Sequence, residues 1–201
     1  MREDAISSII CNNDECRDRV KPLISFFINI EKSLKTFEKP TLVSNSKPLI
    51  ENIVVPSKTM KRLEEYPDEI KRYILARLLS LYYSKEQGYI HGECPICGYT
   101  PKVVILKRRE GNLYSGYEPR LRCLCGYETD WNEWRCPSCG GEGRDLFDTY
   151  ILNNAILIRR CKICGFKSYS IENPMERYVQ IYVILLNSLD EKVSLTDATE
   201  K

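Results

Sequence analysis

Eight of the ten cysteines lie in four close pairs, and their spacing predicts bound metal. The pairs are Cys94 with Cys97, Cys123 with Cys125, Cys136 with Cys139, and Cys161 with Cys164. A glycine follows each pair directly, and glycine tolerates positive φ and lets backbone amides approach the sulfurs. Two cysteines on one tight turn point at a common centre. A second turn, carried back by a β-hairpin, completes a tetrahedron of four thiolates.

Disulfides or free core thiols are the alternative to metal. Cysteines spaced in this way, in a chain that shows no export signal, are more often metal ligands. The chain is also rich in Lys, Glu, Arg and Ile and has two Gln. This bias is seen in hyperthermophiles, whose intracellular proteins do contain disulfides. We therefore expect two metal ions and keep disulfides as the competing interpretation.

Consecutive pairs are expected to share an ion, so that Cys94, Cys97, Cys123 and Cys125 form one site and the other four paired cysteines form the second. This arrangement keeps each closed loop short, which costs less chain entropy. A cross-braced arrangement of the same pairs remains open. Four thiolates suit zinc or iron. Zinc is the expected metal for a structural site with every position filled, and iron is the alternative.

Cys11 and Cys16 stand apart from the four pairs. Five positions on a helix turn through about 500°, so the two side chains would not share a helical face. They are expected to be buried core thiols, with a disulfide or an additional metal ligand as the alternative.

The elements around the cysteines predict an α+β fold in three parts. Residues 1–90 are expected to form a helical domain. Residues 91–172, in which Gly, Cys and aromatic residues alternate with short β-type runs, are expected to form a double four-cysteine module of tandem zinc-ribbon or rubredoxin-like β units. Residues 173–201 are expected to form a C-terminal helix and a tail.

Apolar spacing and end signals place the helices. One helix is expected from Pro22 to about Phe37. Its apolar face is expected to hold Leu23, Phe26, Phe27, Ile30, Leu34 and Phe37. A short helix is expected from Ser57. Another begins after Pro67, and its apolar face extends to Leu81 and Tyr82.

The clearest strands are expected at 103–106 and 155–158, with a turn at Asn153–Asn154 before the second. Asn173 is expected to cap the last helix. Residues 178–189 are apolar on most faces, which indicates a buried helix that clamps the two parts of the fold together. An exposed helix that docks a partner is the alternative.

Charge argues against a nucleic-acid binder, which is the main competing function. The net charge is +2. Residues 92–172 hold 12 Lys and Arg against 10 Asp and Glu, and two tetrathiolate sites would bring this segment to about −2. Basic runs at 107–109 and 159–160 are the local patches that an RNA could use.

Catalysis and membrane insertion are also disfavoured. His91 is the only histidine, so acid–base chemistry based on histidine has little to work with, and His91 is expected in an exposed loop. Four thiolates leave no open coordination position for a substrate. The densest apolar run, at 181–186, is far shorter than the roughly 20 residues that cross a bilayer. We expect a cytoplasmic protein that is not an enzyme.

The order of the cysteine pairs resembles the formate dehydrogenase accessory protein (FdhE) family. The resemblance covers roughly residues 90 to 190 and includes the Thr129-Asp130-Trp131 stretch between the second and third pairs. It differs from the family pattern in the single residue between Cys123 and Cys125, and in Asn132, where the family often has histidine. The resemblance implies a helical domain followed by two rubredoxin-like modules. It also implies a chaperone-like role, in which the protein binds the catalytic subunit of formate dehydrogenase or of a related molybdenum or tungsten oxidoreductase. An iron-based redox or metal-delivery protein is a third possibility.

Overall fold

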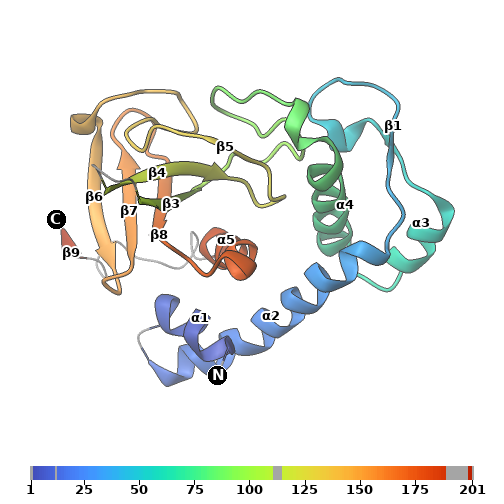
Figure 1. Cartoon of the computed structure of the whole chain (residues 1–201), viewed down its shortest axis with the longest axis horizontal. Coiled ribbons are helices and arrows are strands. Elements are labelled where there is room, and N and C mark those ends of the chain that lie inside the picture. The colour runs from blue at the N-terminus through green and yellow to red at the C-terminus, as the bar shows by residue number, and fades with distance from the viewer. Residues whose placement is uncertain (1, 12, 111–114, 189–198, 201) are drawn as a thin grey trace.

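A computed structural model describes residues 2–11, 13–110, 115–188 and 199–200 of the chain. It has the α+β architecture expected from the sequence, with helices from both ends of the chain packed against a β-sheet (Figure 1). Of the predicted tail after Asp190, only the short strand β9 (Thr199–Glu200) lies within the described residues.

The helices come mostly from the first half of the chain. The α-helices are α1 (Arg2–Ile10), α2 (Asp14–Ser33), α3 (Ser57–Leu63), α4 (Asp68–Tyr83) and α5 (Val179–Ser188). Short 3-10 turns are η1 (Leu34–Thr36), η2 (Leu49–Glu51), η3 (Ser84–Glu86), η4 (Arg144–Leu146) and η5 (Glu176–Tyr178). The predicted starts of α3 at Ser57 and of α4 directly after Pro67 are confirmed.

The strands form two antiparallel units of three. The first unit is β3 (Val103–Glu110), β4 (Ser115–Arg122) and β5 (Glu128–Asp130), and the second is β6 (Phe147–Leu152), β7 (Ile156–Cys161) and β8 (Lys167–Glu172). A separate two-stranded ribbon pairs β1 (Thr41–Leu42) with β2 (Ile53–Val54). The predicted strands at 103–106 and 155–158 are confirmed, as is the turn at Asn153–Asn154, where both residues have positive φ.

A parallel pairing of β3 with β8 joins the two units edge to edge. Strand β9 pairs antiparallel with β6 at the outer edge, so the result is one seven-stranded sheet in the order β5-β4-β3-β8-β7-β6-β9. The first strand of one unit therefore lies beside the last strand of the other, and each unit carries one group of four cysteines. Since the two units share a sheet, they form one β layer.

One apolar core lies between this sheet and helices α1, α2 and α5. It contains Ile6 and Ile24 from the N-terminal helices, Ile105 and Ile158 from the sheet, and Leu186 from α5. Every side chain of α5 from Val179 to Leu186 is buried, which confirms the buried-helix interpretation. Figure 1 shows α5 between the sheet and the N-terminal helices. It therefore contacts both halves of the chain, as the clamp interpretation expected.

Two helix starts differ from prediction. Helix α2 begins at Asp14, because the Asn13 side chain caps it by accepting a hydrogen bond from the Cys16 N–H. Pro22 therefore lies inside the helix. Asn173 caps nothing, since it has φ of 42° and α5 begins at Val179 after η5. Its side chain instead accepts a hydrogen bond from the backbone N–H of Arg108.

Two helices bury part of the predicted apolar face, since Ile30 and Leu34 of the first and Tyr73, Ile74 and Leu78 of the second are buried, but one end of each face is not. In α2, Ile24 is buried, whereas Leu23 and Phe26 are exposed. In α4, the exposed residues are Leu81 and Tyr82. Helix α4 packs on two sides. Part of it enters the main core, and another part covers the first group of cysteines.

Candidate metal centres

Each of the four cysteine pairs forms a tight turn of the same construction, which we call a knuckle. The carbonyl of the first cysteine accepts a hydrogen bond from the N–H of the glycine that closes the turn. These N···O distances are 2.9 Å at Cys94, 2.8 Å at Cys123, 3.0 Å at Cys136 and 2.8 Å at Cys161. The four glycines have φ between 75° and 84°. The Cys123–Cys125 knuckle is one residue shorter than the others, and it closes with the same bond.

The knuckles meet in two groups of four thiols. Site 1 is Cys94, Cys97, Cys123 and Cys125, and site 2 is Cys136, Cys139, Cys161 and Cys164. Hairpin β3–β4 connects the two knuckles of site 1, and hairpin β6–β7 connects those of site 2. The pairing of consecutive pairs is therefore confirmed, and the cross-braced arrangement is excluded.

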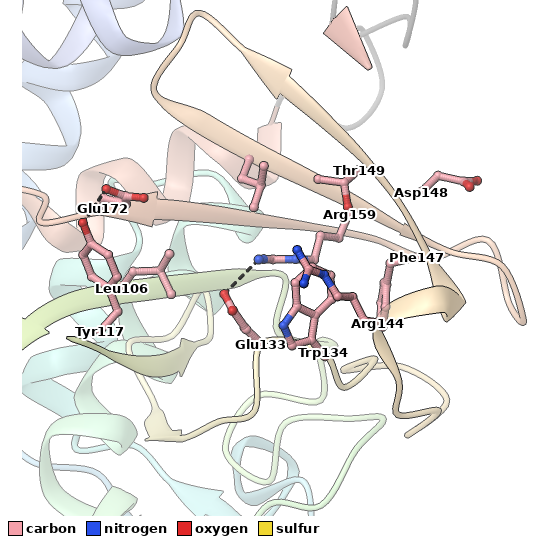
Figure 2. A pocket seen from close by; sticks show the side chains of 11 residues that line it. Leu106, Tyr117, Glu133, Trp134, Arg144, Phe147, Asp148, Thr149, Arg159 and Glu172 are labelled. Atoms are coloured by element: carbon pink, nitrogen blue, oxygen red, sulfur yellow. Dashed lines mark hydrogen bonds and ion pairs between the residues drawn. The ribbon is translucent and has the colours of Figure 1, made fainter. Parts of the chain in front are cut away.

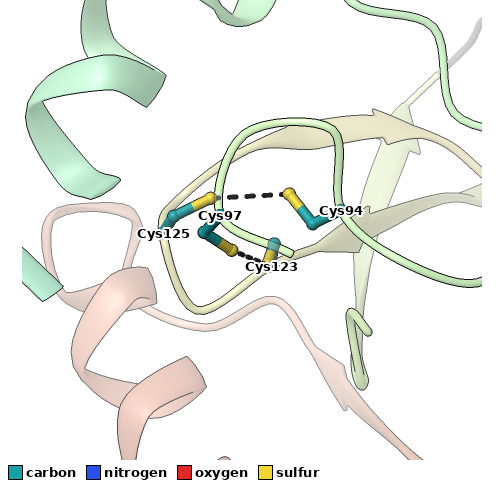
Figure 3. A group of neighbouring side chains, drawn as sticks. All are labelled: Cys94, Cys97, Cys123 and Cys125. Carbon is teal, nitrogen blue, oxygen red and sulfur yellow. Dashed lines mark hydrogen bonds between the residues drawn. The ribbon is translucent and has the colours of Figure 1, made fainter. Parts of the chain in front are cut away.

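The sulfurs have the separation that a tetrahedral metal requires. In site 1, Cys94 and Cys125 are 3.7 Å apart at sulfur, and Cys97 and Cys123 are 3.4 Å apart (Figure 3). In site 2, the corresponding distances are 3.6 Å and 3.8 Å. A tetrahedron of Zn–S bonds of about 2.3 Å has edges of about 3.8 Å. Each group could therefore hold one metal ion, and the all-sulfur donor set suits zinc or iron.

The thiols also influence one another's protonation. Hydrogen bonds from Cys123 and the other site 1 thiols lower the pKa of Cys97. Hydrogen bonds with Cys125, Cys94 and Cys97 raise the pKa of Cys123. Burial raises the pKa of Cys125 and of Cys136, because a charged thiolate is poorly solvated there. Four such thiols cannot all ionise without a cation among them, and a divalent metal supplies that charge.

Site 1 is packed inside the protein. All four of its cysteines are buried, in a cluster with Leu49, Ile96 and Tyr127. The chain at Leu49–Ile50 pairs with the first knuckle, since the N–H groups of Leu49 and Ile50 donate to the carbonyls of Pro95 and Ile96 at 2.9 Å each. Helix α4 adds Ala76 and Leu79 to the same cluster.

Site 2 is enclosed on one side only. Cys136 and Cys161 are buried against Phe147, whereas Cys139 and Cys164 reach the surface. The neighbouring Ile163 side chain is 60% exposed. A backbone N–H from Gly141 lowers the pKa of Cys139. The two sites therefore have similar geometry but very different access to solvent.

Two polar side chains that the sequence did not single out hold the shorter knuckle of site 1. Arg77 of α4 donates to the carbonyl of Cys125 at 2.9 Å and forms an ion pair with Glu31 at 2.6 Å. Gln180 of α5 donates to the carbonyl of Leu124 and accepts from Arg122. The sequence offered one signal for each of these roles: Arg77 is an arginine on the apolar face of a predicted helix, and Gln180 is a glutamine in an otherwise apolar helix.

The segment before the first knuckle links the two sites. The Tyr89 hydroxyl donates to the carbonyl of Pro137 at 2.7 Å, and the Gly92 N–H donates to the same carbonyl at 2.7 Å. His91 is exposed, as predicted, and its ring lies against Gly140. The segment directly before the first knuckle of site 1 therefore contacts the Cys136–Cys139 knuckle of site 2.

Cys11 and Cys16 correct the prediction, because they form a disulfide. The prediction treated both as members of one helix, in which they would point apart. The chain instead turns between α1 and α2 and brings the two Cα atoms to 5.5 Å. This disulfide is remote from the metal sites in sequence and contributes no ligand to them.

A groove of about 640 Å³ lies on the face of the sheet opposite the helices, beside site 2. Figure 2 shows Arg159 in its middle, where it forms an ion pair with Glu133 at 2.8 Å. At one end, the Tyr117 hydroxyl donates to Glu172 at 2.9 Å. At the other end, the guanidinium group of Arg144 lies 5.1 Å from the ring centroid of Trp134, and Arg159 approaches the same ring from the middle of the groove at 4.6 Å.

Comparisons with protein-family models, curated proteins and solved structures find no match to this chain. Among the helices of the described residues, none combines the length and apolar character needed to span a membrane.

Proposed function

We propose that this protein is a metal-binding accessory protein that acts through contact with another protein. The observation that carries the proposal is the pair of four-thiol groups with tetrahedral spacing. Zinc is the proposed metal, because four thiolates complete a structural site and leave no open position. Iron is the alternative, since it accepts the same donors.

The proposed partner is the catalytic subunit of formate dehydrogenase or of a related molybdenum or tungsten oxidoreductase. The motif resemblance motivates this choice, and the proposed place of action is the cytoplasm. The Thr129-Asp130-Trp131 stretch, which is part of this resemblance, has a structural role in this chain. The Trp131 indole donates to the carbonyl of Arg135 at 3.1 Å and packs against Tyr89. The stretch thus connects the last strand of the first unit to the first knuckle of site 2.

The basic residues support a protein partner over a nucleic acid. Lys107 and Arg122 both pair with Glu128, at 3.2 Å and 2.6 Å. Arg159 is buried against Glu133, and Arg160 lies 3.5 Å from Asp148. A phosphate would have to displace a carboxylate at each of these positions. Attraction to a polyanion is correspondingly weak.

The groove supports binding over catalysis. Its central charged side chain, Arg159, is neutralised by Glu133, and the Tyr117 hydroxyl is engaged by Glu172. A general acid or base needs a free proton site within reach of substrate. We therefore propose no enzymatic activity for this chain.

Two measurements test the proposal. Reduced protein purified from its native source is expected to contain two metal ions per chain, each with four sulfur neighbours by X-ray absorption. Immobilised protein is expected to capture the oxidoreductase subunit at moderate as well as low salt, because apolar and aromatic anchors resist screening.

A variant with Arg108, Arg109, Arg159 and Arg160 changed to Ala serves as the comparison. Capture of the subunit by both proteins with negligible RNA binding supports the proposal. Salt-sensitive RNA binding that is lost in the variant, without capture of the subunit by either protein, assigns the nucleic-acid function instead.

A further inference from the structure

The two sites differ in what protects them. Site 1 lies beneath α4, the Leu49–Ile50 segment and the Gln180 side chain. Its four cysteines are at most 1% exposed. Site 2 projects from the end of hairpin β6–β7. Only its inner half is covered, by Trp134, Leu146, Phe147 and Phe166.

The Cys161–Cys164 knuckle of site 2, which we call the outer knuckle, has few neighbouring atoms around its closing glycine. An added Cβ at its glycine, Gly165, would meet nothing within 4 Å. At the equivalent glycine of site 1, Gly126, an added Cβ would lie 1.8 Å from Arg77. Polar contacts of the outer knuckle with η4 and β6 come from Lys162. Its N–H donates to the carbonyl of Leu146 at 2.8 Å, its ammonium donates to the carbonyl of Asp145 at 2.9 Å, and the same ammonium lies 3.6 Å from the Asp148 carboxylate.

We propose that site 2 exchanges its metal ion with external thiolate ligands, whereas site 1 retains its ion as a permanent part of the fold. This inference rests on the proposed metal-binding function. The class of ligand is a small thiol or a cysteine-rich acceptor protein. The surface sulfurs of Cys139 and Cys164 are the point of entry.

The exchange is a ligand substitution without oxidation or reduction. An incoming thiolate approaches from the side of Cys139 and Cys164 and forms one metal–sulfur bond. One of these two cysteine sulfurs leaves, its metal–sulfur bond breaks, and it takes up a proton from water. Repetition removes the ion while Cys136 and Cys161 remain anchored in the inner cluster. At site 1, the same approach first requires α4 or the Leu49–Ile50 segment to open, and local opening of packed structure slows exchange.

The experiment uses the full chain loaded with two zinc ions. Zinc release is followed with the chromophoric chelator 4-(2-pyridylazo)resorcinol and, separately, with glutathione as the competing thiol. Two kinetic phases of equal amplitude are expected, one zinc each, with the first about tenfold or more faster than the second. Glutathione is expected to accelerate the first phase in proportion to its concentration.

Alkylation with N-ethylmaleimide, stopped at intervals and read by peptide mass spectrometry, assigns the phases without any variant. Modification of Cys139 and Cys164 is expected to accompany the fast phase, and modification of site 1 the slow one. The Cys161→Ser protein should lose the fast phase and keep the slow one.

Release of both ions at one rate, or earlier alkylation of site 1, overturns the inference while the proposed function stands. A chain that binds fewer than two metal ions contradicts the proposed function itself. The two failures are therefore distinguishable.

Discussion

At the scale of single residues, the metal ligands could be predicted from sequence and their supports could not. Close pairs of cysteines followed by glycine commonly bind metal, so residue type and spacing were sufficient to predict the ligands. The role of Arg77 depends on where α4 lies relative to the Cys123–Cys125 knuckle. These positions are 48 residues apart in sequence, and nothing local to either one encodes their contact.

Gly126 and Gly165 provide a matched test of that contact. Both close a knuckle with positive φ, 84° and 75°. Alanine at either position costs about 1–2 kcal/mol for the left-handed backbone. Gly126→Ala additionally displaces Arg77 from Glu31, which keeps its hydrogen bond from Tyr73 but loses the charged partner, for a further loss of about 1.5–3 kcal/mol. Urea unfolding of the zinc-loaded proteins checks this, and equal losses at the two positions would show that the Arg77 contact contributes nothing.

At the scale of elements, local signals predicted the hairpin turn and the helix starts after Pro56 and Pro67. They failed where a side chain had two possible partners. Asn173 has the composition of a helix cap, but its neighbour in space is β3, and its backbone N–H donates to the carbonyl of Leu106 at 3.0 Å. The side chain thus extends the parallel pairing of β3 and β8 by one bond. Only the tertiary arrangement decides between the two roles.

Substitution of Asn173 tests its role at the junction between the two sheet units. Asn173→Ala removes the acceptor for the Arg108 N–H and places an ordinary residue at φ of 42°. A loss of about 1–2 kcal/mol in the free energy of unfolding is expected. Asn173→Asp keeps an acceptor and a residue that tolerates this backbone, so its loss should be clearly smaller. If alanine and aspartate prove equally tolerated in chemical denaturation, the bond does not stabilise the junction.

At the scale of the whole molecule, the sequence indicated helical and ribbon segments, whereas the structure shows how they share a core. The apolar run at 103–106 predicts the strand β3 but not its parallel pairing with β8, because that pairing joins residues more than sixty positions apart. Site 1 lies where α4, the Leu49–Ile50 segment and the first sheet unit meet. Among the described residues, the contacts of site 2 are with its own unit and the Tyr89–Gly92 segment. Loss of the ion from site 1 and loss of the ion from site 2 should therefore destabilise different parts of the fold.

Hydrogen exchange can measure which elements lose stability when either ion is lost. The variants Cys97→Ser and Cys161→Ser each remove one metal ligand. In Cys97→Ser, the cluster that contains Ala76 and Leu79 loses the metal ion that stabilises it. The amides of α4 are therefore expected to exchange at least about tenfold faster, since local stability there falls with the site. In Cys161→Ser, protection should fall in β6 and β7, and α4 should keep its wild-type rates, because its described contacts with the cysteines are to site 1 alone. The two variants act as controls for each other, as each loses one thiol and one ion. Equal loss of protection in α4 would mean that the fold responds to either ion as one cooperative unit, and the separation between a structural site and a peripheral one would then not hold.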